Sequence, residues 1–175
     1  GRIVTMDPER PEIRDGAILV EDGRIVAVVP WREAAGEPCR DLGPVTLVPG
    51  LINAHTHLEL SHLAGRVQGG RGFSAWADAL FAAMRIHRAA PSDLAAALAA
   101  AHASGTCFVA DVVGRDAASV RNALAAHGLR GHLFRELSGR GALPAMSPQD
   151  WPGPWSPAVH SLYSSSPVLA RAAKA

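Results

Sequence analysis

Two histidines and a carboxylate follow one another at every second residue in the segment 48–61. They are His55, His57 and Glu59, and they come after an apolar run that Pro49-Gly50 interrupts. Because side chains alternate across a strand, an extended segment would place all three on one face. Two neutral imidazoles on one face can bind a divalent ion, and a catalytic zinc site typically has three protein ligands and an open position for water. The spacing predicts part of a metal site, although His-x-His also occurs by chance on exposed strands.

The chain after this motif alternates between strand and helix patterns. Apolar residues recur at helical spacing over 73–88, and cations lie in the last turn of that segment. We expect strands over 51–57, 106–113, 129–137 and 158–163, helices over 73–88, 92–105 and 116–127 and from 167 onward, and a loop over 138–157. Such alternation predicts right-handed βαβ units and a parallel sheet.

The first 47 residues have a different pattern, with short apolar runs and no helical period. The runs 16–20 and 24–29 flank Asp22-Gly23, which is a strong signal for a hairpin turn. This part of the chain is therefore expected to form a small β unit before the motif.

Length, composition and charge limit the class of protein. The chain has 175 residues, of which 48% are hydrophobic, so it is expected to be globular. It carries 17 basic and 16 acidic residues, a balance that favours neither nucleic acid nor an anionic membrane as a partner. There is no long apolar run, no signal segment and no Cys-x-x-Cys spacing. The default expectation is a protein of the reducing cytoplasm.

The stretch from Pro49 to His57 resembles the first barrel strand of the amidohydrolase superfamily, in which Pro-Gly is followed after four residues by His-x-His. The resemblance implies an α/β fold: the N-terminal half of a (β/α)8 TIM-type barrel, preceded by part of a small β-sandwich. Residues 49–175 would supply the first four βα units of the barrel, and residues 1–48 the partial sandwich. The barrel of the superfamily has eight strands, so the missing C-terminal half is an implied partner.

Chemistry in such barrels lies at the carboxyl ends of the strands. The segment 159–164 resembles the His-x-x-Tyr-Ser/Thr segment of the deaminase and chlorohydrolase branch, and the block 55–88 looks like the aminodeoxyfutalosine deaminases. The resemblance implies that His55 and His57 are metal ligands. It also implies that four side chains line the substrate pocket, namely those of Glu59, Trp76, Glu136 and His160. The proton shuttle and the remaining metal ligands would lie outside this chain.

The activity implied is hydrolytic deamination of an adenine-type nucleoside, such as aminodeoxyfutalosine, adenosine or S-adenosylhomocysteine, by metal-activated water. One divalent ion is expected, zinc first and iron as the alternative, and activity would require the rest of the barrel. Two alternatives remain open. The first is another amidohydrolase activity on a chloro-triazine, guanine or a cyclic amide, and the second is a non-catalytic half-barrel that binds or assembles. The partner would be a small molecule, and the sequence leaves the formation of a homo-oligomer open.

Several of these residues also have plainer interpretations. Trp76 lies at helical spacing and could belong to a core, and Glu59 could cap the next helix or pair with Arg66. Asp111, at the end of the second predicted barrel strand, could accept hydrogen bonds from a helix N-terminus. Glu136 could form an ion pair with its neighbour Arg135.

Overall fold

The computed structural model describes residues 1–141 and 153–174. The chain forms two compact units, Gly1–Gly50 and Leu51–Ala175, and each is treated by itself. The first unit contains a sheet with the strand order β2-β1-β5 and a separate hairpin of β3 and β4. Its elements are β1 (Arg2–Val4), β2 (Glu12–Arg14), β3 (Gly16–Glu21), β4 (Arg24–Pro30), α1 (Trp31–Ala34) and β5 (Thr46–Leu47).

The predicted hairpin is confirmed. Strands β3 and β4 are antiparallel, and Glu21 pairs with Arg24 across the turn. Both turn residues, Asp22 and Gly23, have positive φ angles of 49° and 74°, as a two-residue turn of this kind requires. Asp-Gly therefore determines the register of this hairpin locally.

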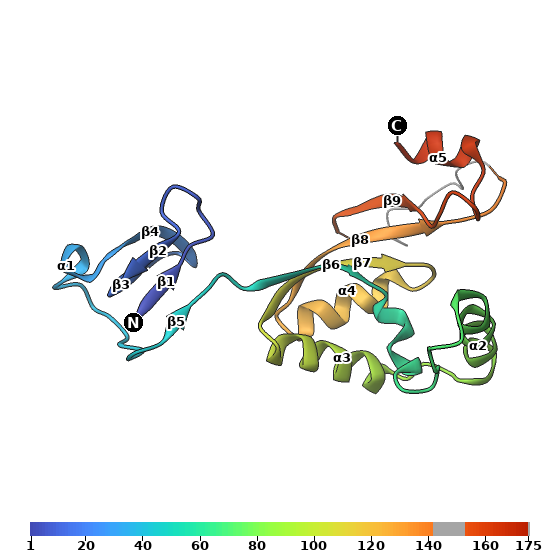
Figure 1. The fold of residues 1–175 in the computed structure, drawn as a ribbon, viewed down its shortest axis with the longest axis horizontal. Helices are drawn as coiled ribbons and strands as arrows, with labels where there is room; N and C mark the ends of the chain where they lie inside the picture. Colours follow the sequence, from blue (N-terminus) through green and yellow to red (C-terminus); the bar gives the residue numbers. More distant parts are fainter. Residues whose placement is uncertain (142–152, 175) are drawn as a thin grey trace. The chain divides into compact units, whose positions relative to one another are not determined.

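The second unit is built on a parallel sheet with the strand order β6-β7-β8-β9 (Figure 1). Its elements are β6 (Leu51–Thr56), the 3₁₀ helix η1 (Leu58–Leu63), α2 (Phe73–Ile86), α3 (Pro91–Ala103), β7 (Thr106–Val113), α4 (Ala117–Ala126), β8 (Arg130–Leu137), β9 (Trp155–Val159) and α5 (Pro167–Lys174). The predicted α/β class with a parallel sheet is thus confirmed. None of the helices within the described ranges is long and apolar enough to span a membrane.

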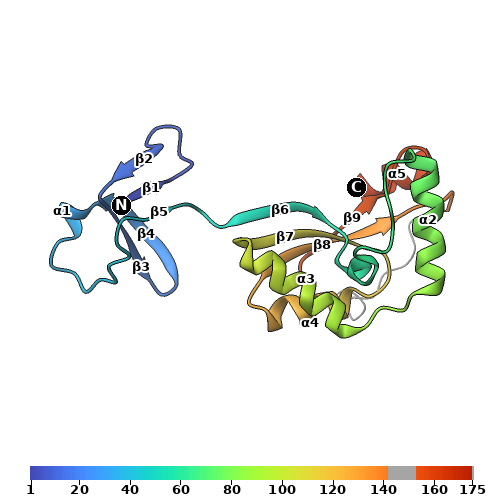
Figure 2. The same cartoon turned by 60° about the horizontal axis from the view of Figure 1, so that its bottom comes forward.

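The core of this unit lies between the sheet and helices α3 and α4, which lie together on one face of it (Figures 1 and 2). Strand residues Val109, Val113 and Leu133 are buried there against Leu98 of α3 and Leu124 of α4. Because alternate residues of a strand face opposite sides, the odd-numbered positions of β7 and β8 form this apolar face. The even-numbered positions are left for the other face.

The first barrel strand was predicted over 51–57, and β6 ends at Thr56. The chain is not extended as far as Glu59, because η1 begins at Leu58. Leu58 instead donates its backbone N–H to the carboxylate of Asp111, at 2.8 Å. Beyond Thr56 the backbone pairing of β6 with β7 thus ends, and η1 is bonded to β7 through the side chain of Asp111.

The fourth strand was predicted over 158–163, but β9 covers Trp155–Val159, while residues 142–152 of the predicted loop lie outside the described ranges. Arg121 of α4 donates to the carbonyl oxygens of Gly131 and Pro154, both at 2.7 Å, and so starts β9 beside β8. Beyond Val159, hydrogen bonds between Ser161 and Ser164 turn the chain. Pro157 lies on β9, the last of the four described strands in the sheet order.

Candidate metal and substrate site

A pocket of about 370 Å³ opens at the carboxyl ends of the four parallel strands. Four of the six predicted site residues line it: His55, His57, Glu136 and His160. The other lining residues are Ala54, Val112, Phe134, Ala158 and Val159. The structure thus brings together side chains from four strands at the edge where a parallel barrel carries its chemistry.

The position of His55 depends on an irregularity in β6. Asn53 pairs with Val109, but Thr56 pairs with Asp111, so β6 has one residue more than β7 in this interval. In a regular ladder, His55 would lie opposite Asp111 and share the helix-covered face. The extra residue moves Thr56 to that face instead, and His55 lines the pocket with Val112. Bulges of this kind occur next to active sites, where they re-aim a side chain.

His57 lies just beyond the strand, with φ −131° and ψ 72°, and directly precedes η1. Its ring is beside that of His55, with 5.0 Å between the ring centroids and an interplanar angle of 75°. The predicted pairing of the two imidazoles is therefore present, although only His55 belongs to β6. Their role as metal ligands stays a prediction.

Asp111 is fully buried and lies on the opposite side of β6–β7 from the pocket. Its Oδ1 accepts hydrogen bonds from the Thr56 hydroxyl at 2.5 Å and from the Leu58 N–H at 2.8 Å. Within the described residues, Oδ2 has no hydrogen-bond partner. Burial raises the pKa of Asp111 to about 6, and the two hydrogen bonds oppose this shift. The geometry supports the interpretation of Asp111 as an acceptor for a helix N-terminus, here that of η1.

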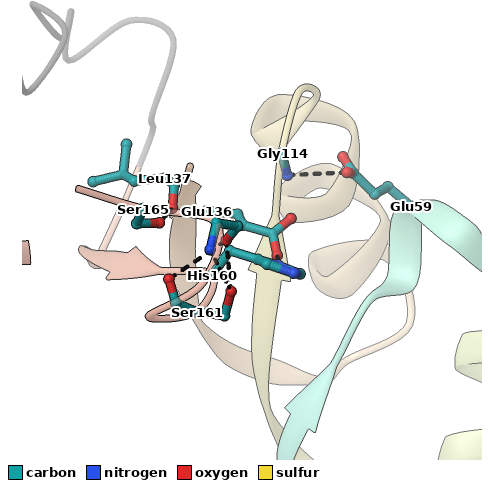
Figure 3. A network of polar contacts seen from close by, with 8 residues as sticks. Glu59, Gly114, Glu136, Leu137, His160, Ser161 and Ser165 are labelled. Atoms are coloured by element: carbon teal, nitrogen blue, oxygen red, sulfur yellow. Dashed lines mark hydrogen bonds and ion pairs between the residues drawn. The ribbon is translucent and has the colours of Figure 1, made fainter. Parts of the chain in front are cut away.

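Glu136 and His160 form a contacting pair on the pocket wall (Figure 3). Nδ1 of His160 lies 2.5 Å from Oε1 of Glu136. The backbone N–H of His160 donates to the Leu137 carbonyl, which also accepts a hydrogen bond from the Ser165 hydroxyl. Glu136 thus has an ion-pair or hydrogen-bond partner other than the expected Arg135, and the pair is held at the ends of β8 and β9.

Glu59 and Trp76 are not among the residues that line this pocket. Both carboxylate oxygens of Glu59 accept backbone N–H bonds after β7, from Gly114 at 2.9 Å (Figure 3) and from Arg115 at 3.1 Å. Neither alternative holds: the next helix, α2, has no side-chain cap at its N-terminus, and Arg66 Nε donates to the His62 carbonyl. Glu59 joins η1 to the end of β7.

Trp76 belongs to a row of aromatic rings rather than to a core. It is 37% exposed, and its ring centroid lies 5.9 Å from that of Phe73. The ring centroids of Phe73 and Tyr163 are 6.4 Å apart, and those of Tyr163 and His160 are 6.1 Å apart. The row connects α2 to the pocket residue His160, but Trp76 is at its far end.

Phe134, Ala158 and the pair formed by His132 and Ser156 were not predicted from the sequence. His132 Nε2 lies 2.9 Å from the Ser156 hydroxyl oxygen, on β8 and β9. A signal was present, because His132 and Phe134 precede Glu136 at intervals of two and therefore share its face. The wrong boundary of β9 concealed the same relation for Ser156, Ala158 and His160.

The donor set fits part of a zinc site. Two imidazoles lie side by side on the pocket wall, which suits an ion that prefers nitrogen ligands. In the part of the chain that the structure describes, no group of three His, Cys, Asp or Glu side chains could hold a metal ion. A complete site of this kind needs at least one more ligand from outside these residues.

Named deaminases are similar to part of this chain. No family model matches the chain. A 5-methylthioadenosine/S-adenosylhomocysteine deaminase of Nitratidesulfovibrio vulgaris is 48% identical over 68 residues, which cover 36% of this chain and 15% of that protein. A 5'-deoxyadenosine deaminase of Methanococcoides burtonii is 34% identical over 65 residues, which cover 37% of this chain and 15% of that protein.

Solved structures show the same fold over nearly the whole chain. Helicobacter pylori aminofutalosine deaminase, in complex with methylthio-coformycin, superimposes with a TM-score of 0.72 at 19% identity over 98% of this chain. A triazine hydrolase variant gives 0.70 at 19% identity over the same share. An atrazine chlorohydrolase mutant of Arthrobacter aurescens, complexed with zinc and atraton, gives 0.54 at 22% identity over 77% of the chain. The chain spans 47% of the length of the first two structures.

Proposed function

We propose that this chain is part of a metal-dependent hydrolase that deaminates an adenine-type nucleoside. Its resemblance to the deaminase and chlorohydrolase branch of the amidohydrolase superfamily is confirmed by these similarities. The observation that carries the proposal is one pocket with His55 and His57 on one side and the Glu136–His160 pair on the other. The named activities of the sequence relatives support deamination of adenosine derivatives.

The proposed architecture follows from the same resemblance. Residues 49–175 would be the first four βα units of a (β/α)8 barrel, and residues 1–48 part of a β-sandwich, with the other half of the barrel as the missing partner. The four parallel strands and the division of the chain after Gly50 support this arrangement. A cytoplasmic location and self-association remain part of the proposal.

The roles of the residues follow from their geometry. His55 and His57 would hold one divalent ion, zinc first and iron as the alternative, through neutral imidazole nitrogens. When bound, such an ion would lower the pKa of its water to about 7 and so supply hydroxide at neutral pH. Glu136 accepts from Nδ1 of His160 and orients the ring, so Nε2 is the ring nitrogen that would contact the substrate.

Phe134 and Val112 line the pocket between these two pairs and would provide the apolar surface that a planar base needs. Trp76 would reach the substrate only at the far end of the aromatic row. Glu59 would affect the substrate site only indirectly, through its hydrogen bonds to the N–H groups of Gly114 and Arg115. These two residues are retained as weaker candidates for substrate contact.

The proposal is tested with the natural protein that contains this segment, by measuring ammonia released from 5'-deoxyadenosine, 5-methylthioadenosine and S-adenosylhomocysteine. We expect His55→Ala and His57→Ala each to lower kcat/KM by at least about a hundredfold, because loss of a ligand removes the activated water. His127→Ala, at the end of α4, serves as the matched control. Equal activity in all three variants would contradict the proposal.

A second candidate function is hydrolysis of a chloro-triazine, and the similarity to triazine hydrolase structures is the observation that favours it. Product analysis separates the two activities, because a chloro-triazine releases chloride whereas an adenine nucleoside releases ammonia. Chloride release without ammonia release would favour this second function.

A further inference from the structure

Asp111 contacts the two residues that flank His57 in the chain. Its Oδ1 accepts from the hydroxyl of Thr56 and from the N–H of Leu58, at 2.5 and 2.8 Å. One buried carboxylate oxygen thus binds the residue before His57 and the residue after it. We propose that Asp111 is a positioning residue that holds His57 in the orientation needed to bind the metal ion, an inference that rests on the proposed function.

The need for such a residue follows from the end of β6. His57 has left the strand, so no ladder hydrogen bond to β7 is available to determine where its backbone turns. The bulge between Asn53 and Thr56 has already shifted the register. A histidine beyond a bulge and before a 3₁₀ helix would sample several orientations if the chain on both sides were not held.

Asp111 is suited to this task because of where β7 places it. It is the register partner of Thr56, and its side chain is buried between the sheet and η1. The pocket lies on the other face of the same strands, where Val112 is a lining residue. Asp111 therefore binds the residues on both sides of His57 from the face opposite the pocket. Its carboxylate does not compete with the His57 ring for a metal or a substrate.

Glu59 adds a second connection between the same two elements. Its carboxylate accepts from the N–H groups of Gly114 and Arg115, just after β7. His57 thus lies between Thr56 on one side and Leu58 and Glu59 on the other, and all three are bound to β7 or to the turn after it. Partners of metal ligands that fix their orientation typically affect metal affinity by about 10- to 100-fold.

The experiment measures the order of the His57 ring and the zinc affinity in the same samples of the natural protein that contains this segment. Histidine side-chain NMR signals are recorded without metal and during a titration with zinc, for the wild type and for Asp111→Leu, Asp111→Asn and Thr106→Val. Asp111→Leu removes the acceptor, and Asp111→Asn keeps an acceptor oxygen. Thr106→Val removes a different buried polar group from β7, where Thr106 is 9% exposed, and is the matched control.

We expect the wild-type His57 ring to adopt one rotamer. In Asp111→Leu the His57 ring should exchange between several rotamers, and zinc binding should weaken about tenfold. Asp111→Asn should restore both properties to within about threefold of the wild type, because its oxygen can accept the same two bonds. Thr106→Val should leave both unchanged. If Asp111→Leu does not fold, Thr56→Val, which removes one of the two donors, is expected to show the same effects to a smaller degree.

Two results would overturn the inference: a folded Asp111→Leu or Thr56→Val chain with an ordered His57 and unchanged zinc affinity, or an equal loss in Thr106→Val. Zinc that leaves the wild-type His55 and His57 signals unchanged would contradict the proposed function. In that case, the comparison without metal still decides whether Asp111 orders His57.

Discussion

At the scale of single residues, the side chains around the pocket are held by carboxylates. Asp111 binds the chain on both sides of His57, Glu59 binds the turn after β7, and Glu136 contacts the ring of His160. All three act across more than 20 residues of sequence. Each of them therefore depends on the sheet to bring its partners close.

Asp111 should make stability depend on pH. Its pKa is raised from 3.8 to about 6, first by burial and then by the nearby charge of Glu59, while hydrogen bonds and His55 lower it. Between these two values the folded chain keeps a proton that the unfolded chain has lost. The free energy of unfolding should therefore fall by up to about 3 kcal/mol as the pH rises through this window.

Urea unfolding of the wild type and of Asp111→Asn over this pH range measures the effect. The difference between the two curves isolates Asp111, because the other carboxylates are common to both chains. We expect the variant to lack this part of the pH dependence. Parallel curves would show that Asp111 titrates with its ordinary pKa in the folded chain.

Glu59→Gln should loosen the turn after β7. The carboxylate accepts one N–H bond with each oxygen, and a glutamine has only one acceptor oxygen for these two donors. We expect a loss of about 1–2 kcal/mol in the free energy of unfolding and faster hydrogen exchange at Gly114 and Arg115. Glu9→Gln, at an exposed position outside these contacts, is the control. Unchanged exchange at both amides would contradict the role given to Glu59.

At the scale of elements, close packing of α4 against the sheet depends on the absence of a side chain at one position of β8. A Cβ at Gly131 would lie 3.0 Å from Leu124 Cδ1, from Val109 Cγ2 and from the Val109 carbonyl oxygen. The two side chains belong to the buried core, and the third atom belongs to the backbone of β7. The neighbours could accommodate a methyl group only by moving the helix or the strand.

Gly131→Ala is therefore expected to destabilise the chain by about 1–2 kcal/mol, the cost of overpacking reduced by the smaller entropy of the unfolded state. Gly69→Ala is the matched control, because nothing lies within 4 Å of a Cβ at that position. Thermal or urea unfolding of the two variants decides the matter. A Gly131→Ala chain as stable as Gly69→Ala would mean that α4 adjusts freely.

At the scale of the whole molecule, the second unit has an open parallel sheet. Strands β6 and β9 are the first and last of the four described strands in its order, and Ile52 of β6 is 68% exposed. Exposed apolar edge strands pair readily with other chains. We expect this chain to associate as its concentration rises.

Ile52→Lys should reduce that association, because a charge on an edge strand opposes pairing with another edge. Sedimentation velocity at several concentrations measures it. Ile86→Lys is the control, since Ile86 is an equally exposed isoleucine at 72% but ends helix α2. An equal reduction by both substitutions would assign the association to apolar surface in general.

Much of this architecture was predictable from local patterns. The strand Thr106–Val113, the Asp22-Gly23 hairpin and helices α2, α3 and α4 were expected close to their observed bounds. Local propensity, hydrophobic period and turn chemistry determine such elements with little help from distant residues. The stretch from Pro49 to His57, together with the family that it resembles, likewise pointed to His55 and His57, which line the pocket.

Only the tertiary structure decided the features that depend on pairing with a distant strand. Simple alternation places His55 and His57 on the same face, but the bulge against β7 determines which face His55 takes. The same holds for Glu59, whose donors lie 55 and 56 residues further along the chain. The sequence by itself determined the kinds of side chain and the elements that carry them. Register, bulges and buried hydrogen bonds join residues that are far apart in sequence, and local periodicity contains no information about those contacts.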